Sequence, residues 1–132
     1  MNFYKILCIA TSALFAYLFV SFFLDSDSFI TDIGLQASQT TFILAKRASI
    51  FMLGISILHL SSMTLIHSKA RQNICLATGI TLLGLACMGS YEFARGTVNS
   101  TILVSVIIET SLGVSYISVF MLNRKNRKVQ LA

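Results

Sequence analysis

Proline and tryptophan are absent from the 132 residues, and charged residues make up only 11% of the chain. The absence of proline argues against the broken helices that many secondary transporters use. Charge is nearly missing from four stretches, 6–24, 48–66, 72–91 and 96–123, which hold 19, 19, 20 and 28 residues. A hydrocarbon core about 30 Å thick needs about 20 helical residues at about 1.5 Å rise per residue. Each stretch is therefore long enough to cross a bilayer.

Lipid offers the backbone no hydrogen-bond partners, so each stretch is expected to be a helix. The sequence predicts an all-α fold, an integral membrane antiparallel four-helix bundle, because short connections make neighbouring helices antiparallel. We expect a single domain, 1–132, with no room for a soluble domain. The predicted spans are 6–24, 46–66, 72–91 and 100–122, followed by a basic cytoplasmic tail at 123–132.

The start of the second span is ambiguous. Ser38 or Thr40 can cap a helix that begins before Lys46 and Arg47. A helix starting near Thr41 would place Arg47 about 9 Å along its axis. There the guanidinium must extend to the surface or find a partner in the bundle.

Basic residues are distributed unequally between the two sides of the predicted bundle. If both termini are cytoplasmic, the cytoplasmic side carries Lys5, Lys69, Arg71, Arg124, Lys125, Arg127 and Lys128. The opposite side carries Lys46, Arg47 and Arg95. This bias predicts a multi-pass protein of a bacterial cytoplasmic (inner) membrane with the N-terminus and C-terminus cytoplasmic. It also accounts for the net charge of +5 without nucleic-acid binding, which we do not expect.

Catalytic and metal-binding patterns are not recognisable. The three cysteines, Cys8, Cys75 and Cys87, form no Cys-x-x-Cys pair, so we interpret them as packing residues rather than as a redox pair or a disulfide. No set of nucleophile, base and orienting group can be assembled without the loops. We therefore expect no enzymatic activity, no metal and no cofactor.

Glu109 is the only carboxylate inside a predicted span. About ten residues into its helix it would lie near the bilayer midplane, where insertion scales give a charge a cost of about 3 kcal/mol. We expect it to face the bundle and to be either protonated or paired, with Arg47 as the preferred partner. The alternative partners are Arg95, His59, Tyr17 and Tyr116. Two interpretations stay open: a proton-carrying or cation-coordinating carboxylate, and an ion pair that fixes helix register.

The second span carries a polar stripe at helical spacing. Its members, Ser49, Ser56, His59 and Met63, are expected to face protein rather than lipid. Haem ligation by His59 would need a second histidine at similar depth on another helix, so a hydrogen-bonded histidine is the favoured interpretation.

Small residues are frequent in the third span, which should allow close helix approach. They are Ala77, Gly79, Gly84, Ala86 and Gly89. After this span, Gly96 is suited to a left-handed position at the helix end.

Three segments carry a resemblance to a known kind of protein. Ala45–Gly54 has the pattern Ala-x-Arg-x-x-x-Phe-x-x-Gly, Tyr91–Gly96 has Tyr-Glu-x-x-Arg-Gly, and Ile102–Glu109 ends in a last-span glutamate. Over about the last two thirds of its length, the chain resembles small bacterial four-helix inner-membrane proteins grouped as a domain of unknown function. The resemblance implies the fold and a polar cluster on the non-cytoplasmic half, to which it assigns no reaction. The residues of that cluster are Arg47, Glu92, Arg95 and Glu109.

Three functions are compatible with these patterns. The first is helix association, as a homo-oligomer or as an accessory subunit of a membrane complex, which the small residues of the third span favour. The second is a small proton-linked transporter or channel-like subunit in which Glu109 changes protonation, aided by Arg47 and Arg95. The third is a haem- or quinone-linked redox protein that uses His59, with Tyr116 as a further polar candidate. The expected partners are the lipid bilayer and either a second copy or another membrane protein.

Overall fold

The computed structural model describes residues 3–36, 38–66 and 68–129, and over these residues the chain is helical with short connections. The helices are α1 (Phe3–Leu24), α2 (Ser26–Asp32), α3 (Gln39–Ser62), α4 (Lys69–Ala94) and α5 (Ile102–Val129). Four segments are long and apolar enough to cross a membrane: α1, α3, α4 and the part of α5 from Ile102–Asn123. The predictions of an all-α chain and of four helices of membrane-spanning length are confirmed.

Helix α3 begins earlier than the predicted span. Ser38 is its N-cap, and the Ser38 hydroxyl accepts a hydrogen bond from the Thr41 N–H at 3.2 Å. This bond satisfies one of the free N–H groups at a helix start, so residues 39–45, which precede the predicted span, are helical as well. The helix then ends at Ser62 instead of at residue 66.

The predicted loop between the first two spans contains helix α2, so the loop prediction was wrong over Ser26–Asp32. Asp25 caps α2 by accepting a hydrogen bond from the Ser28 N–H. Gly34, with φ of 87°, follows the helix in the left-handed conformation that glycine adopts without strain. The many polar residues of this segment are typical of a loop, but one of them, Asp25, caps the start of a helix.

The C-terminal part of the chain also differs from prediction. Helix α5 continues to Val129, past the predicted end of the span at residue 122. The charged side chains of the predicted basic tail, at 124–128, and residues 130–132 lie outside the described part of the structure.

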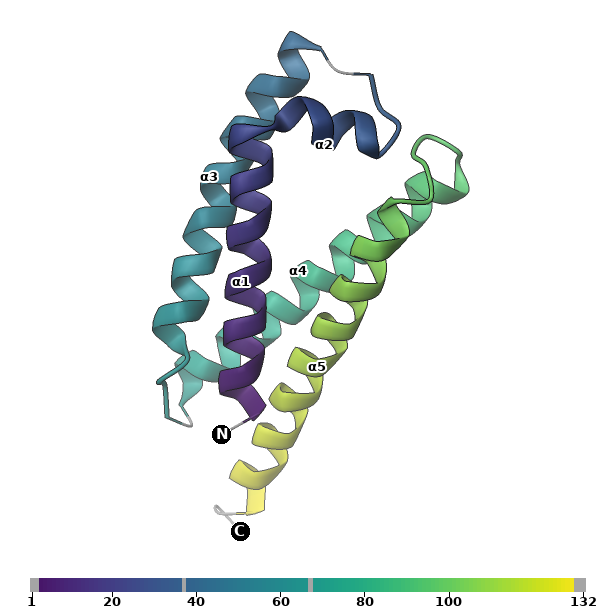
Figure 1. Ribbon diagram of the computed structural model, residues 1–132. Helices are drawn as coiled ribbons and strands as arrows, with labels where there is room; N and C mark the ends of the chain where they lie inside the picture. Colours follow the sequence, from purple (N-terminus) through teal and green to yellow (C-terminus); the bar gives the residue numbers. More distant parts are fainter. Residues whose placement is uncertain (1–2, 37, 67, 130–132) are drawn as a thin grey trace.

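The four long helices are arranged as two pairs. Helix α1 packs along α3 and α4 packs along α5, and the helices of each pair run in opposite directions (Figure 1). The pairs meet at the end where both termini lie, which we call the junction end, and they diverge toward the other end, the open end (Figure 1). Most contact between the pairs is made by α1 with α5. Helix α2 extends from the top of α1 across the open end.

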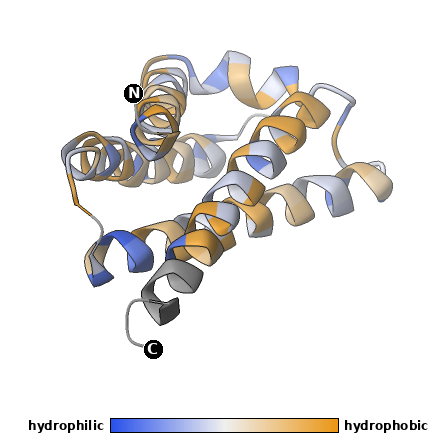
Figure 2. Cartoon of the chain, turned by 90° about the horizontal axis from the view of Figure 1, so that it is seen from below, coloured by the Kyte–Doolittle hydropathy of each residue, from blue (hydrophilic) through white to orange (hydrophobic). Residues whose placement is uncertain are grey.

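Apolar residues cover the outside of the long helices, and hydrophilic residues gather mainly near the helix ends and on α2 (Figure 2). Phe51, Met88 and Ile107 are 75%, 66% and 65% exposed. A continuous apolar surface of this kind is typical of a protein that meets lipid or another protein.

Small residues let α4 and α5 approach closely. A Cβ atom added at Gly79 would lie 2.7 Å from Cδ1 of Ile117 and 3.3 Å from the carbonyl oxygen of Gly113. One added at Gly84 would meet nothing within 4 Å. The predicted close approach of the third span is therefore confirmed at Gly79, whereas Gly84 faces outward.

Candidate functional site: a cleft lined by carboxylates

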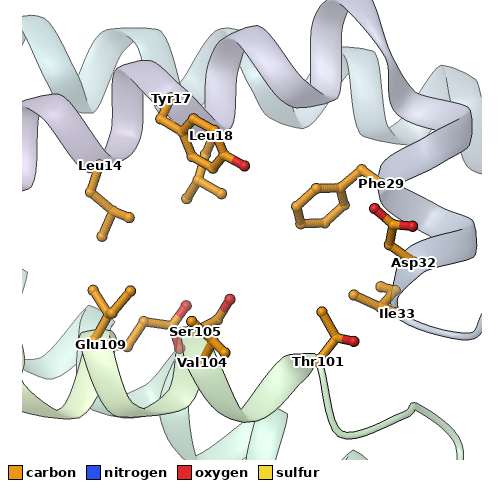
Figure 3. A pocket seen from close by; sticks show the side chains of 11 residues that line it. Leu14, Tyr17, Leu18, Phe29, Asp32, Ile33, Thr101, Val104, Ser105 and Glu109 are labelled. Atoms are coloured by element: carbon orange, nitrogen blue, oxygen red, sulfur yellow. The ribbon is translucent and has the colours of Figure 1, made fainter.

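A cleft of about 260 Å³ lies between the two helix pairs, toward the open end. Helices α1 and α5 form its walls, and α2 lies across its end (Figure 3). Its apolar lining residues are Leu14, Leu18, Phe29, Ile33, Val104 and Ile108. Its polar lining residues are Tyr17, Asp32, Thr101, Ser105 and Glu109. The lining thus combines apolar walls with three hydroxyls and two carboxylates, and none of the described residues that form it is basic.

One face of α5 supplies the polar wall. Thr101 precedes the helix, and Ser105 and Glu109 follow at intervals of four residues, so all three side chains lie on the side that faces α1 (Figure 3). Glu109 is half-buried. It lies about 5 Å along the axis from the middle of the membrane-length segment Ile102–Asn123, on the open-end side.

The end of α2 is fastened to the connection between α4 and α5. The Asn99 backbone N–H donates to the Ile33 carbonyl oxygen at 2.9 Å. The Asn99 side-chain amide donates to the Asp32 carbonyl oxygen at 2.7 Å. These two bonds hold α2 across the open end of the cleft. We call α2 in this position the roof of the cleft, and it contributes Phe29 and Asp32 to the lining.

The four residues of the predicted polar cluster do not gather in one place. Glu92 and Glu109 line a second hollow of about 250 Å³ on α4 and α5. The Arg95 guanidinium lies over the Tyr91 ring, 5.5 Å from its centroid. Arg47 is exposed on α3, a helix that packs mainly on α1 rather than on α4 or α5. The two carboxylates thus line one hollow, and neither arginine is among the described residues that line it.

The ion pair expected between Arg47 and Glu109 is not formed in the described part of the chain. Helix α1 contacts both α3 and α5, whereas α3 and α5 have no comparable contact with each other. The pairs also diverge toward the open end, where α3 begins (Figure 1), and Arg47 lies in the first half of that helix. The sequence could not reveal this, because depth along a helix does not say which helices are neighbours.

A second group of polar side chains is buried at the junction end. His59 of α3 is only 1% exposed, and its Nδ1 lies 3.2 Å from the Tyr116 hydroxyl of α5. Its Nε2 lies 3.1 Å from the Thr78 hydroxyl of α4. The structure thus brings together the two further polar candidates, His59 and Tyr116. Since both ring nitrogens have hydroxyl partners, neither is free to bind haem iron in this arrangement.

Helices α1 and α3 are joined by a reciprocal pair of hydrogen bonds near His59. The Ser12 hydroxyl donates to the Ser56 carbonyl oxygen, and the Ser56 hydroxyl donates to the Ser12 carbonyl oxygen, both at 2.9 Å. Ser49, Ser56 and His59 are all buried, which confirms that the polar stripe of the second span faces protein.

Sequence reasoning missed the contribution of α1 and α4 to this junction. Arg71, expected among the surface charges, is only 7% exposed, and its guanidinium lies 4.0 Å from the centroid of the Tyr4 ring. Thr11 is fully buried. The available signal was the spacing of Tyr4, Cys8 and Thr11, which places them on one face of α1.

No metal site or disulfide is formed by the described residues. They contain no group of three or more His, Cys, Asp or Glu side chains placed to hold a metal ion. Cys8 and Cys75 are buried free thiols, and Cys87 is an exposed one.

Comparison with known proteins gives no relative: no family model, curated protein or solved structure matches the chain. The resemblance to small bacterial four-helix inner-membrane proteins therefore stays a prediction.

Proposed function

We propose that this chain is a small, non-enzymatic, proton-linked membrane transporter, in which the Glu109 carboxylate alternately holds a proton and a cationic solute. One observation carries the proposal: Glu109 faces a cleft that, over the part of the chain that the structure describes, has no basic residue in its lining. A carboxylate within a membrane segment needs a counter-charge or a proton. When the lining supplies no counter-charge, a proton or a bound cation has to do so.

The chemistry of the cleft suits a small organic cation. Glu109 and Asp32 supply negative charge at two points of the lining. The rings of Tyr17 and Phe29 offer aromatic faces, to which cations are attracted. The remaining lining is largely apolar and complements the hydrocarbon part of such a solute. A hydrated metal ion would gain little from these apolar walls.

We place the four long helices as an antiparallel bundle across a bacterial cytoplasmic membrane, with both termini and the junction end on the cytoplasmic side. Lys5 and Lys69 at the junction end support this orientation. Asp25, Asp27 and Asp32 lie at the open end. In this orientation the cleft faces the non-cytoplasmic side of the membrane.

The test uses the full chain in sealed liposomes that contain a pH-sensitive dye. Adding benzyltrimethylammonium outside should raise the internal pH, because each cation that enters releases protons outward. Neopentylbenzene, its uncharged isostere, should move no protons. Glu109→Gln should slow the exchange by about tenfold or more, equivalent to about 1.4 kcal/mol of activation free energy.

Glu92→Gln is the matched control, because it makes the same change in the neighbouring hollow. It should exchange at close to the wild-type rate. Equal rates for wild type and Glu109→Gln, or no cation-dependent proton movement in wild type, would contradict the proposal.

Helix association is a second candidate function, favoured by the outward glycines. Gly54 and Gly84 are exposed, and a Cβ atom added at either would meet nothing within 4 Å. Small residues that are not used inside one molecule allow a helix of a second copy to approach closely. Gly84→Leu should then lower the oligomeric state in nanodiscs, measured by light scattering, while helix content is retained. An unchanged oligomeric state would argue against association through this face.

A further inference from the structure

Buried polar side chains gather at the junction end, among them Tyr4, Thr11, His59, Arg71 and Tyr116, and we call this region the polar junction. We infer that the polar junction holds a file of internal water molecules that conducts protons between the junction-end surface and Glu109. The inference rests on the proposed function and extends it, because a carboxylate that exchanges protons needs a route to both sides of the membrane. The cleft supplies a route on the open-end side only. The junction between the helix pairs supplies the other half.

Buried polar atoms without partners mark the course of the file. Among the described residues, the Tyr4 hydroxyl, the Thr11 hydroxyl and the Arg71 Nε are enclosed and have no hydrogen-bond partner. These residues are 2%, 0% and 7% exposed. Buried polar groups in proteins are normally satisfied, and internal water is the usual partner where protein groups are missing. Three such atoms in one region indicate water that connects them.

The groups are arranged along one line. Tyr4, Cys8 and Thr11 occupy one face of α1 over about 10 Å of helix axis. At the junction end of this line, the Arg71 guanidinium lies over the Tyr4 ring at 4.0 Å. At its inner end, Cys8 packs in one buried cluster with Tyr116 of α5, and fully buried Thr11 follows one helical turn later. The line therefore leads from the chain terminus toward the middle of the molecule.

His59 gives the line a group that can relay protons. Its Nδ1 lies 3.2 Å from the Tyr116 hydroxyl, and its Nε2 lies 3.1 Å from the Thr78 hydroxyl. A neutral imidazole donates from one nitrogen and accepts at the other. When one nitrogen takes up a proton as the other releases one, the ring changes tautomer and its charge is restored. Only O–H and N–H bonds are made and broken, so no oxidant or reductant is needed.

Helix α5 connects this relay to the cleft. Tyr116 and Glu109 are seven residues apart on one face of α5, which corresponds to about 10 Å along the axis. This distance is too long for a direct hydrogen bond, so a few water molecules must complete the route past Leu112. The titratable groups of the file, from each helix packed around it, are Tyr4, Cys8, His59, Arg71, Cys75 and Tyr116.

Proton flux in liposomes tests the file through paired variants. Thr11→Val and Tyr116→Phe remove a hydroxyl from the file, and each should lower proton flux by about tenfold or more. Thr110→Val and Tyr91→Phe make the same chemical changes at exposed positions and should conduct like wild type. Thr11→Ser, which keeps the hydroxyl, should restore the flux that Thr11→Val loses.

Water contact gives a second readout that does not depend on transport. Solid-state NMR with magnetisation transferred from water should show fast transfer to Thr11 in both wild type and Glu109→Gln. Ala86, only 4% exposed and outside the file, should receive magnetisation slowly. Equally slow transfer to Thr11 would overturn the file, whatever the flux measurements show.

The outcomes separate the file from the proposed function. Wild-type flux in Thr11→Val together with lost flux in Glu109→Gln overturns the file and leaves the proposed function standing. Lost flux in Thr11→Val together with wild-type flux in Glu109→Gln removes Glu109 from the route and overturns the proposed function. An absence of flux in wild type overturns both.

Discussion

At the scale of single residues, the surroundings of His59 and Glu109, two ionisable side chains within the long helices, differ. His59 has a hydroxyl partner on each ring nitrogen, supplied by two other helices. Glu109 faces a cleft whose lining contains no basic residue. A side chain that the fold fully satisfies contributes to the stability of the fold, whereas one that it leaves without a counter-charge is free to bind a solute or a proton. We therefore assign a packing role and a relay to His59, and ligand binding to Glu109.

Replacing His59 by leucine should destabilise the junction. The Tyr116 and Thr78 hydroxyls would lose their shared partner, at a cost of about 1–2 kcal/mol in the free energy of unfolding. Reversible unfolding in mixed micelles, followed by circular dichroism, measures this loss. In a double-mutant cycle, His59→Leu combined with Tyr116→Phe should cost less than the sum of the single changes. Strict additivity would show that the contact carries no coupling energy.

Replacing Glu109 by glutamine should leave stability nearly unchanged, within about 0.5 kcal/mol. The reason is that no ion pair in the described part of the chain is lost with the charge. The same unfolding experiment measures the effect. A loss of several kcal/mol would instead indicate that Glu109 is one half of a buried ion pair, because breaking such a pair leaves an uncompensated charge.

At the scale of helices, the α4–α5 pair is held by close backbone approach. Gly79→Leu should force the two helices apart, because even a Cβ atom there would lie 2.7 Å from Ile117. We expect a loss of about 1–3 kcal/mol in the free energy of unfolding. Gly84→Leu is the matched control when both proteins are compared as monomers in micelles, because within one molecule the space around that glycine is open. Equal destabilisation by both changes would contradict this account of the packing.

The roof over the cleft makes a separate prediction at this scale. Asn99→Ala removes the side-chain bond to the Asp32 carbonyl oxygen and the bond that the Asn99 Oδ1 accepts from the Thr101 N–H, but it keeps the backbone bond to Ile33. Amide hydrogen exchange should become faster in α2 and stay unchanged in α1, because local opening costs less when a tethering bond is lost. Unchanged protection of α2 would show that its packing on α1 and α3 suffices to hold the roof.

The sequence predicted where the long helices lie along the chain better than it predicted which helices pack against each other. Long apolar runs predicted four helices because the pattern is a property of each segment alone. The spacing of Ser49, Ser56 and His59 predicted their buried face for the same reason. Whether Arg47 pairs with Glu109 was not predictable, since pairing depends on which helices are neighbours. Burial of Arg71 was missed because a basic residue near a span end ordinarily lies at the surface.

At the scale of the whole molecule, the two helix pairs are joined at one end and separated by the cleft toward the other. Near the termini, the two pairs are connected by one buried cluster of side chains, which contains Tyr4, Cys8, Cys75 and Tyr116. Toward the open end, the connection that crosses the cleft is made by α2 and Asn99. An arrangement packed firmly at one end and lightly at the other favours hinge motion about the packed end.

The width of the open end should depend on the charge of Glu109. A carboxylate needs water or a cation beside it, which keeps the apolar walls apart, whereas an uncharged side chain allows them to close. Spin labels can be attached at Thr40→Cys and Thr97→Cys, both exposed near the open end, in a protein that lacks the exposed native Cys87. Double electron–electron resonance between the two labels then measures the distance between the helix pairs. Glu109→Gln should give a shorter mean distance than wild type at neutral pH. Labels at Ser61→Cys and Ser118→Cys, exposed toward the junction end, should give the same distance in both proteins. If the two open-end distances agree as well, the cleft is rigid, and solute has to enter and leave it without movement of the helix pairs.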